Sequence, residues 1–275
     1  MAGPENPSWV MPRPAATLIC LRDAEPDRLE ALMTVRHQTM VFGSGALVFP
    51  GGRVEAVDQE IAAAGAALCD KAAAGMPPEA LGFRIAAIRE TFEEAGLLLA
   101  RDARSGEPVG DERLQELVSM CRAQICAGTL SFSTFLERER FLLSTGELTY
   151  FAHWVTPRTR PKRFDTHFFL ARAPHGQVAG HDSGEAVATE WITPARAIEQ
   201  TAAGRYKLLF PTRMNLLKLA RWSSVADATA AATQSEIVAV EPEWITGTDH
   251  GDQIRIPETA GYGGSHFPVI DPPAM

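Results

Sequence analysis

Three glutamates, Glu90, Glu93 and Glu94, lie within five residues of the chain. Like charges three and four residues apart repel one another on a helix, and they weaken that helix when it stands alone. A helix that carries them anyway needs a compensating cation. Carboxylate oxygens suit a hard divalent ion such as Mg²⁺, which usually keeps several waters and substrate phosphates as its other ligands. The spacing therefore indicates a metal site, and the competing interpretation is a solvated acidic helix face.

The helix that would carry the glutamates has an apolar stripe. At about 100° per residue its apolar side chains fall within an arc of roughly 80°. They are Leu81, Ile85, Ile88, Phe92, Ala95 and Leu99. The three glutamates fall within an arc of about 100°, nearly opposite this stripe. We expect Gly96 to end the helix in a left-handed conformation. One face would then pack on the core, while the other presents acid to a cleft or to water.

A glycine turn upstream could complete the site. Phe49-Pro50-Gly51-Gly52 follows the apolar run Ala46-Leu47-Val48. A strand that ends in Pro-Gly-Gly is typical of a tight turn with accessible backbone. Such a turn can offer carbonyl oxygens to a cation or amides to a phosphate. Asp58 follows six residues after Gly52.

Together these residues resemble the box of the Nudix hydrolase family. That box has a glycine, five residues, a glutamate, seven residues and then Arg-Glu-apolar-x-Glu-Glu-x-Gly-apolar. The chain is similar at Gly52, Asp58, Arg89, Glu90, Glu93, Glu94, Gly96 and Leu97. It departs by having Asp58 in place of glutamate, Thr91 at an apolar position and 30 residues between Asp58 and Arg89. A long insertion in a surface connection costs little entropy.

The interruption resembles one branch of the family, the peroxisomal coenzyme A diphosphatase-like proteins and their bacterial relatives. Further similar segments extend the resemblance over roughly residues 14–223; they are Arg36-His37-Gln38, Arg163 to Phe169, Glu185-Ala186-Val187 and Trp191-Ile192-Thr193-Pro194. The coenzyme A signature of related enzymes has an arginine where this chain has Val41.

The resemblance implies a metal-dependent hydrolase that cleaves a phosphoanhydride bond in a nucleoside diphosphate derivative, with coenzyme A or acyl-coenzyme A as the leading substrate. Such a reaction needs a water aligned with a phosphorus and cations on the oxygens that gain charge. Bound Mg²⁺ or Mn²⁺ could supply both. The alternative is a non-catalytic Nudix-fold module that binds a nucleotide or a protein. The intact glutamates favour the enzyme, because a retired site has no need of three mutually repelling acids.

The resemblance also assigns the metal ligands. Glu90 and Glu94 come first, with Glu93 beside them and a carbonyl of the Gly51-Gly52 turn as a further oxygen.

Catalysis would also involve Arg89 and one distant acid. Arg89 would pair with a box carboxylate and hold the helix against the loop; the competing interpretation is a plain surface salt bridge. Glu185 is the expected distant carboxylate, and Glu190 and Asp182 compete with it. The general base stays open between Glu90 and Glu185.

Substrate phosphates would meet arginines. A basic cluster stands out in this acidic chain, at Arg158, Arg160, Lys162 and Arg163. Arginine forks suit phosphate oxygens. We therefore expect Arg36, Arg158 and Arg163 to bind substrate together with Gly52, whereas the alternative for the cluster is charge balance on a loop. On the strand that follows, period-two alternation would put Asp165 and His167 on one face.

Composition restricts the function classes. The chain has 275 residues, 29.8 kDa, 45% apolar residues and a net charge of −8. It can bury a sizeable core, and its charge argues against binding a nucleic-acid backbone. The sequence shows neither a signal-peptide run near its start nor about 20 successive apolar residues that could span a membrane. The four cysteines lack Cys-x-x-Cys spacing, so we expect reduced thiols in a cytoplasmic protein. A homodimer is a further expectation from family precedent.

We expect an α/β fold, a Nudix α/β/α sandwich with a mixed sheet, helical insertions and a C-terminal extension. The expected divisions are an arm over 1–13, a Nudix domain over 14–223 with insertions at 59–82 and 108–145, and an extension over 224–275. The patterns predict strands over 16–22, 29–35, 148–156, 164–171 and 186–192. We expect Asp111 to cap a helix that runs to about Cys126, and Ser131 or Ser133 to cap another that runs to Leu143. Further helices are expected over 194–203 and over 212–222.

Overall fold

The computed structural model describes residues 10–25, 28–37, 45–180, 186–249 and 251–269. A mixed sheet lies at its centre, with the strand order β10-β7-β8-β1-β2-β3. The long strand β1 (Arg13–Ala24) runs parallel to β8 (Phe164–Arg172) and antiparallel to β2 (Arg28–Arg36). The other members are β3 (Leu47–Val48), β7 (Thr149–Val155) and β10 (Ala239–Val240), with β4 (Gly51–Arg53) on β1 and β9 (Ala186–Ile192) on β2.

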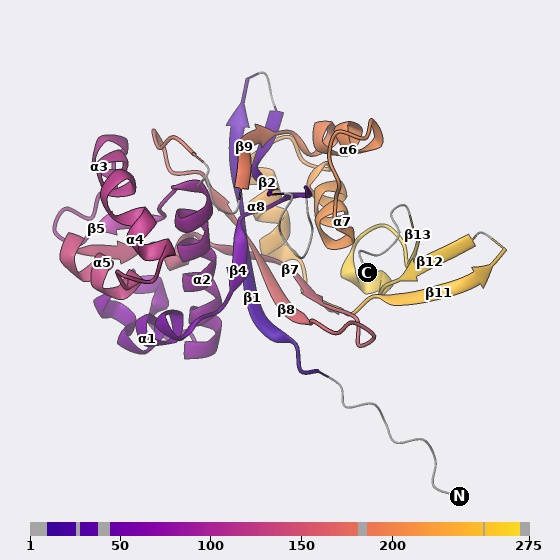
Figure 1. The fold of residues 1–275 in the computed structure, drawn as a ribbon, viewed down its shortest axis with the longest axis horizontal. Helices are drawn as coiled ribbons and strands as arrows, with labels where there is room; N and C mark the ends of the chain where they lie inside the picture. The colour runs from indigo at the N-terminus through magenta and orange to yellow at the C-terminus, as the bar shows by residue number, and fades with distance from the viewer. Residues whose placement is uncertain (1–9, 26–27, 38–44, 181–185, 250, 270–275) are drawn as a thin grey trace, which may run out of the picture.

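Helices cover both faces of this sheet (Figure 1). On one face lie the box helix α2 (Pro78–Ala95), α1 (Ala56–Ala64), α3 (Asp111–Leu117), a π-helical turn (Val118–Arg122), α4 (Ala123–Cys126) and α5 (Phe132–Glu139). On the other lie α6 (Pro194–Ala202), α7 (Phe210–Leu219) and α8 (Val225–Gln234). Successive strand residues alternate between the two layers, so that Leu18 and Phe169 pack with α2 while Ile19 and Leu170 pack with α7. The predicted α/β/α sandwich with a mixed sheet is confirmed.

Two predicted details of the helical layer were wrong. Asp111 does not cap its helix; Gly110 does, and the Asp111 carboxylate instead accepts a hydrogen bond from the Val178 amide. The next helix does not reach Leu143, because Arg140 adopts a left-handed φ of 59° that ends it. Residues Phe141–Leu143 then form β6, which pairs with β5 (Ala100–Asp102). This long-range pairing overrides the local helical pattern.

The segment after α8 packs against the sandwich rather than trailing from it. Antiparallel strands β11 (Glu243–Thr248), β12 (Gly251–Arg255) and β13 (His266–Pro268) form a small sheet. Tyr262 is buried; its hydroxyl donates to Asn215 Oδ1 and accepts from Trp154 Nε1, at 2.7 and 2.9 Å. These bonds link the segment to α7 and β7. The division of the chain into arm, domain, insertions and extension remains a prediction.

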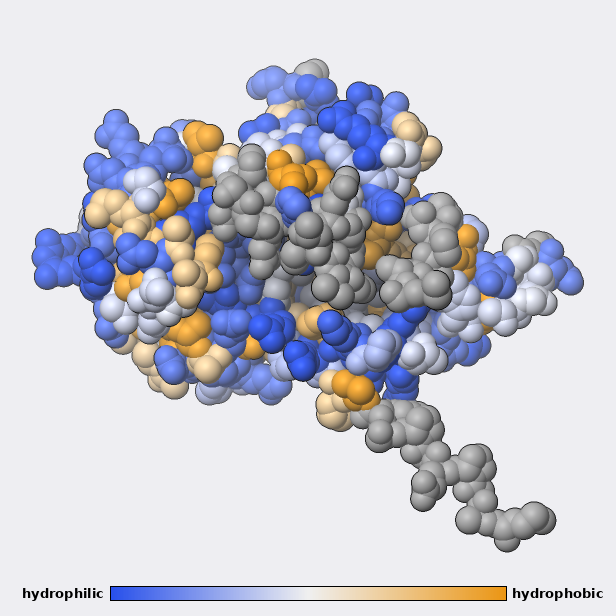
Figure 2. Space-filling view, in the orientation of Figure 1, coloured by the Kyte–Doolittle hydropathy of each residue, from blue (hydrophilic) through white to orange (hydrophobic). Residues whose placement is uncertain are grey.

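In the described ranges, no helix combines the length and the apolar character that crossing a membrane requires. Cys20, Cys69 and Cys121 are free and buried, as expected for reduced thiols. Among the exposed large apolar side chains, Val10 and Met11 are neighbours, whereas Met120, Val178 and Trp244 are far apart in the sequence. On the face that Figure 2 shows, small hydrophobic patches alternate with hydrophilic ones. The cytoplasmic location and the homodimer stay predictions.

Candidate active site

The box helix α2 presents its acids as the sequence predicted. Its stripe residues Leu81, Ile85 and Phe92 are at most 2% exposed. The three glutamates are only partly buried. Gly96 ends the helix with a φ of 69°, and its amide donates to the Phe92 carbonyl at 2.9 Å.

The glycine turn lies against these glutamates, and its strand β4 runs beside α2 (Figure 1). Gly51 and Gly52 belong to β4, which the pairing of Gly52 with Ala16 fixes on β1. The Gly51 amide donates to Glu94 Oε2 at 3.2 Å. A Cβ atom placed on Gly52 would lie 2.5 Å from the Glu90 carboxylate. The turn and the acids therefore share one location, and only glycine at position 52 leaves room for the Glu90 side chain as it stands.

Arg89 holds this arrangement together. Its Nε and Nη2 donate to the two oxygens of Asp58, at 2.9 and 3.0 Å, in a fork between side chains that are 3% and 0% exposed. Its Nη1 lies 2.9 Å from Glu90 Oε1 and 3.1 Å from Glu93 Oε1. Nη2 also donates to the Arg53 carbonyl, which follows the glycine turn. One guanidinium thus faces three carboxylates, and the remaining negative charge suits a divalent cation with oxygen ligands.

Burial changes the acidity of these groups. Loss of hydration raises the pKa of Glu90 to about 7; the Arg89 charge opposes this shift, and the Glu93 charge adds to it. Burial also raises the pKa of Glu93, again against the effect of Arg89. Without a bound cation, Glu90 in the folded protein therefore stays largely protonated until the pH approaches 7.

This shift predicts a pH-dependent stability of the metal-free protein. Between pH 4.5 and 7 the folded state binds more protons at Glu90 than the unfolded state does, so the unfolding free energy falls as pH rises through this window. A shift of this size corresponds to at most about 3 kcal/mol. We expect Glu90→Gln, in a chelating buffer, to raise the Tm at pH 8 and to leave it nearly unchanged at pH 4.5. Glu79→Gln, at an exposed position of the same helix, is the control. Equal Tm shifts of Glu90→Gln at both pH values would contradict the raised pKa of Glu90.

The two glycines should respond differently to alanine. Gly52→Ala must displace the Glu90 carboxylate, and misplacing a reacting group by about 1 Å can cost about 100-fold in rate. At Gly51 the new Cβ would meet the backbone oxygen of Ala16 at 2.5 Å, so the strands must shift, at about 1–3 kcal/mol. We expect Gly52→Ala to lower turnover mainly and Gly51→Ala to lower Tm. Gly110→Ala, with open space around it, is the matched control for both assays. A lower Tm with unchanged turnover for Gly52→Ala, together with slower turnover and an unchanged Tm for Gly51→Ala, would refute this account.

The predicted phosphate-binding arginines lie elsewhere in the fold. Arg163 is 6% exposed and donates to the carbonyls of Thr156 and Val10 and to Glu241 Oε1, at 2.9, 3.0 and 2.9 Å. Arg158 is exposed and also pairs with Glu241, at 3.3 Å. Both arginines thus hold the β7–β8 connection to the C-terminal segment, and their binding of substrate stays a prediction.

Arg36 ends β2, and its amide donates to the Ala46 carbonyl at 3.0 Å. Its Nε is buried without a hydrogen-bond partner among the described residues. Its contact with substrate also stays a prediction.

Of the three candidates for the distant acid, the structure describes only Glu190. Glu185, Asp182 and Val41 fall outside the described residues. Glu190 pairs with Met33 across β9 and β2, and Met33 packs in the layer of α7. Directly opposite residues share a face, so Glu190 faces away from the box helix. Glu185 remains the predicted carboxylate.

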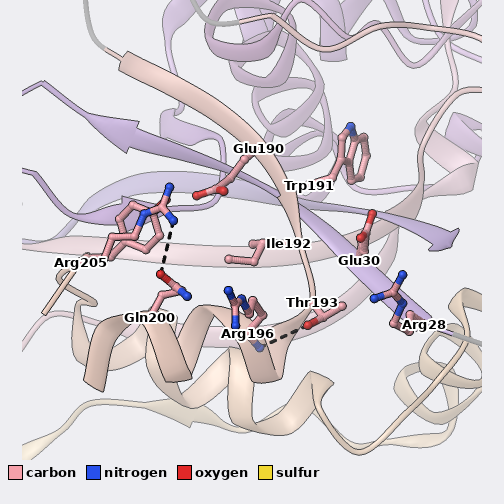
Figure 3. Close-up of a pocket in the computed structure, with 10 residues that line it drawn as sticks. Arg28, Glu30, Glu190, Trp191, Ile192, Thr193, Arg196, Gln200 and Arg205 are labelled. Carbon is pink, nitrogen blue, oxygen red and sulfur yellow. Dashed lines mark hydrogen bonds between the residues drawn. The ribbon is translucent and has the colours of Figure 1, made fainter. Parts of the chain in front are cut away.

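A cavity of about 280 Å³ opens beside Glu190 (Figure 3). Its walls come from β2, β9, α6 and the connection to α7, and it is lined by Arg28, Glu30, Glu190, Trp191, Ile192, Thr193, Arg196, Gln200, Arg205 and Tyr206. Among these residues none belongs to the box. Because the box glutamates do not line this cavity, we do not assign the diphosphate to it.

Local spacing could not reveal two of the site's contacts. One is the bond from Arg89 to the Arg53 carbonyl, and the other is Arg122, whose Nε donates to the Glu93 carbonyl at 2.9 Å. In both contacts the acceptor is a main-chain carbonyl far from the arginine in the sequence, so no residue type in the sequence indicates the contact.

Comparison with known proteins bears on the family of the chain. The family model of the NUDT19 Nudix domain matches residues 60–219, more than half of the chain. The chain belongs to this family. It is a Nudix pyrophosphohydrolase, and its predicted resemblance to the coenzyme A diphosphatase branch is confirmed. The match to the family model begins after Gly51, Gly52 and Asp58, so it does not cover the first half of the interrupted box.

Relatives of this Nudix hydrolase cover much of its length. The acyl-coenzyme A diphosphatase NUDT19 of Gallus gallus is 28% identical over 87% of this chain and 76% of its own. Putative nudix hydrolase 7 of Caenorhabditis elegans is 28% identical over 82% of this chain, which spans 64% of that protein. A crystal structure of a NUDIX hydrolase from Alicyclobacillus acidocaldarius is similar with a TM-score of 0.69 and 28% identity, over 80% of this chain and 96% of that one.

Proposed function

We propose that this Nudix hydrolase cleaves the diphosphate bond of a nucleoside diphosphate derivative with Mg²⁺ or Mn²⁺, and that coenzyme A or an acyl derivative is the substrate. The contact between the glycine turn and the box glutamates carries the proposal. Glu94 bonds to the Gly51 amide, and Gly52 leaves room for the Glu90 carboxylate. The similarity to the chicken acyl-coenzyme A diphosphatase supports the substrate class.

The donor set fits a hard divalent ion. Glu90, Glu93 and Glu94 offer carboxylate oxygens, and Arg89 neutralises only part of the charge around it. In this proposal Glu90 and Glu94 hold the ion, with Glu93 and a carbonyl of the glycine turn beside them. When bound, the ion would stabilise charge on the phosphate oxygens and lower the pKa of a water.

The residues of the chain position the glutamates and take up the proton of the attacking water. The Arg89–Asp58 fork fixes α2 against the start of α1, so the glutamates hold their positions relative to the turn. One carboxylate of the chain must accept a proton from the attacking water. The choice between Glu90 and Glu185 as the general base stays open. Water adds to one phosphorus and the bridging P–O bond breaks, so two phosphate monoesters result.

A substrate screen tests the proposal. We would incubate the protein with coenzyme A, acyl-coenzyme A, dinucleotides and nucleotide sugars in the presence of Mg²⁺ or Mn²⁺, and measure released phosphate monoesters. We expect the fastest turnover for coenzyme A or its acyl derivatives, and none after chelation. Turnover that is fastest on dinucleotides or nucleotide sugars would refute the substrate assignment. Absence of turnover on every compound would refute the proposal.

A further inference from the structure

Two histidines and an aspartate meet on the sheet away from the box glutamates. His153 lies on β7, and Asp165 and His167 lie on β8 (Figure 1). The antiparallel register places His153 directly opposite His167, with Asp165 two residues from His167 on the same face. His153 Nε2 contacts Asp165 Oδ1, and His167 Nε2 lies 3.9 Å from the same oxygen. The three potential ligand atoms all lie within 4.8 Å of one another.

The surrounding residues orient these side chains and leave them accessible. The Phe83 ring stacks on the His167 ring with centroids 3.8 Å apart, and Tyr150 stacks on it at 5.2 Å. The stacked rings fix the plane of the His167 imidazole. The side chains of His153, Asp165 and His167 are still 20%, 33% and 21% exposed, so an ion can reach them from solvent.

We propose that His153, Asp165 and His167 form a second metal site, which takes a divalent transition metal such as Zn²⁺. Two imidazole nitrogens and one carboxylate oxygen are a ligand set that suits such metals and leaves a coordination position open. In a tetrahedral zinc site with bonds of about 2.0 Å, the ligand atoms lie about 3.3 Å apart. Side-chain rotations that move the ligand atoms by about 1 Å would bring these separations to that value, the His153–Asp165 contact opening and the others closing. Strands hold all three residues, which favours a preformed site.

This site is separate from the glutamates. Ala16 on β1 pairs with Gly52 on one side and with His167 on the other. Neighbouring strands lie about 4.8 Å apart, so roughly 10 Å separates the backbones of Gly52 and His167. On α2, seven residues, or about 10 Å of helix, separate Phe83 from Glu90. The oxygen ligands at Glu90 favour hard ions and the imidazoles favour softer ones, so the two sites should select different metals.

Metal binding to the whole, metal-free protein tests this inference independently of hydrolysis. We would titrate Zn²⁺ by calorimetry with millimolar Mg²⁺ present, and record the visible spectrum with Co²⁺ in place of Zn²⁺. We expect the wild type and the control His175→Gln, at an exposed histidine, to bind one Zn²⁺ and to show Co²⁺ bands of tetrahedral nitrogen and oxygen ligation. Asp165→Asn and His153→Gln should each weaken Zn²⁺ binding at least about tenfold.

Several outcomes would overturn the inference. They are a wild type without these Co²⁺ bands, a spectrum dominated by the strong near-ultraviolet absorption of thiolate ligation, or folded variants that bind Zn²⁺ as tightly as the wild type. Circular dichroism checks the fold of each variant. Should Asp165→Asn fail to fold, His153→Gln and the wild-type Co²⁺ spectrum still decide the question.

Discussion

Glu94→Gln should lower turnover at least about 100-fold while leaving the fold intact. The amide keeps the size of the side chain and an oxygen that can accept from the Gly51 amide, but it loses the charge that would hold a hard cation. Loss of a group that merely supports a metal ligand already costs about 10–100-fold, so loss of a ligand should cost no less. Steady-state kinetics on the best substrate of the screen, at saturating Mg²⁺, measures the effect.

Glu79→Gln is the matched control for Glu94→Gln. It makes the same chemical change at an exposed position in the first turn of α2. The control should keep the wild-type rate, and both variants should keep the wild-type Tm within about 2 °C, a change of less than about 1 kcal/mol. Wild-type turnover by Glu94→Gln would show that this carboxylate does not hold the catalytic metal.

Arg89→Met should give the largest loss of stability. Arg89 and Asp58 are 3% and 0% exposed, and removing one partner of a buried pair costs about 3–5 kcal/mol because the other charge stays buried and uncompensated. For a chain of this size that loss lowers the Tm by about 10 °C. Turnover should fall as well, because Glu90 and Glu93 lose the cation that positions them. Thermal unfolding and steady-state kinetics measure the two effects.

Arg196→Met is the control for Arg89→Met. Arg196 pairs with Glu199 three residues later, and the two side chains are 57% and 66% exposed. Exposed pairs of this kind contribute less than about 1 kcal/mol. The double variant Asp58→Asn/Arg89→Met should recover part of the lost stability, since it removes the unpaired charge. A Tm for Arg89→Met that equals that of Arg196→Met would show that the fork does not stabilise the fold.

The sequence predicted those parts of the molecule that local patterns determine. The apolar stripe predicted the box helix and its acidic face, and Gly96 predicted where that helix ends. Strand alternation placed Asp165 and His167 on one face, as the structure confirms. The resemblance to the Nudix box predicted that Arg89 pairs with a box carboxylate, and three such pairs are present.

Contacts between distant residues could not be predicted in the same way. His153 joins Asp165 and His167 only through the register of β7, which shifts at an irregularity between Tyr150 and Ala152. No pattern in either strand determines that shift. Likewise, the Arg163 charge meets Glu241, 78 residues later, so a cluster of cations that suggests a phosphate site is partly used to hold two segments together.

Arg122 connects the helical layer that contains α3, α4 and α5 to the C-terminal end of the box helix α2. It belongs to the π-helical turn, its Nε donates to the Glu93 carbonyl, and its Nη1 donates to the Gly180 carbonyl at 3.0 Å. A cation there offsets the partial negative charge at the end of α2. A truncated chain that keeps only the sheet and its nearest helices would leave that end exposed and poorly anchored. Attempts to miniaturise this enzyme should therefore retain the layer, and substitutions in it and in the catalytic helix should be selected jointly.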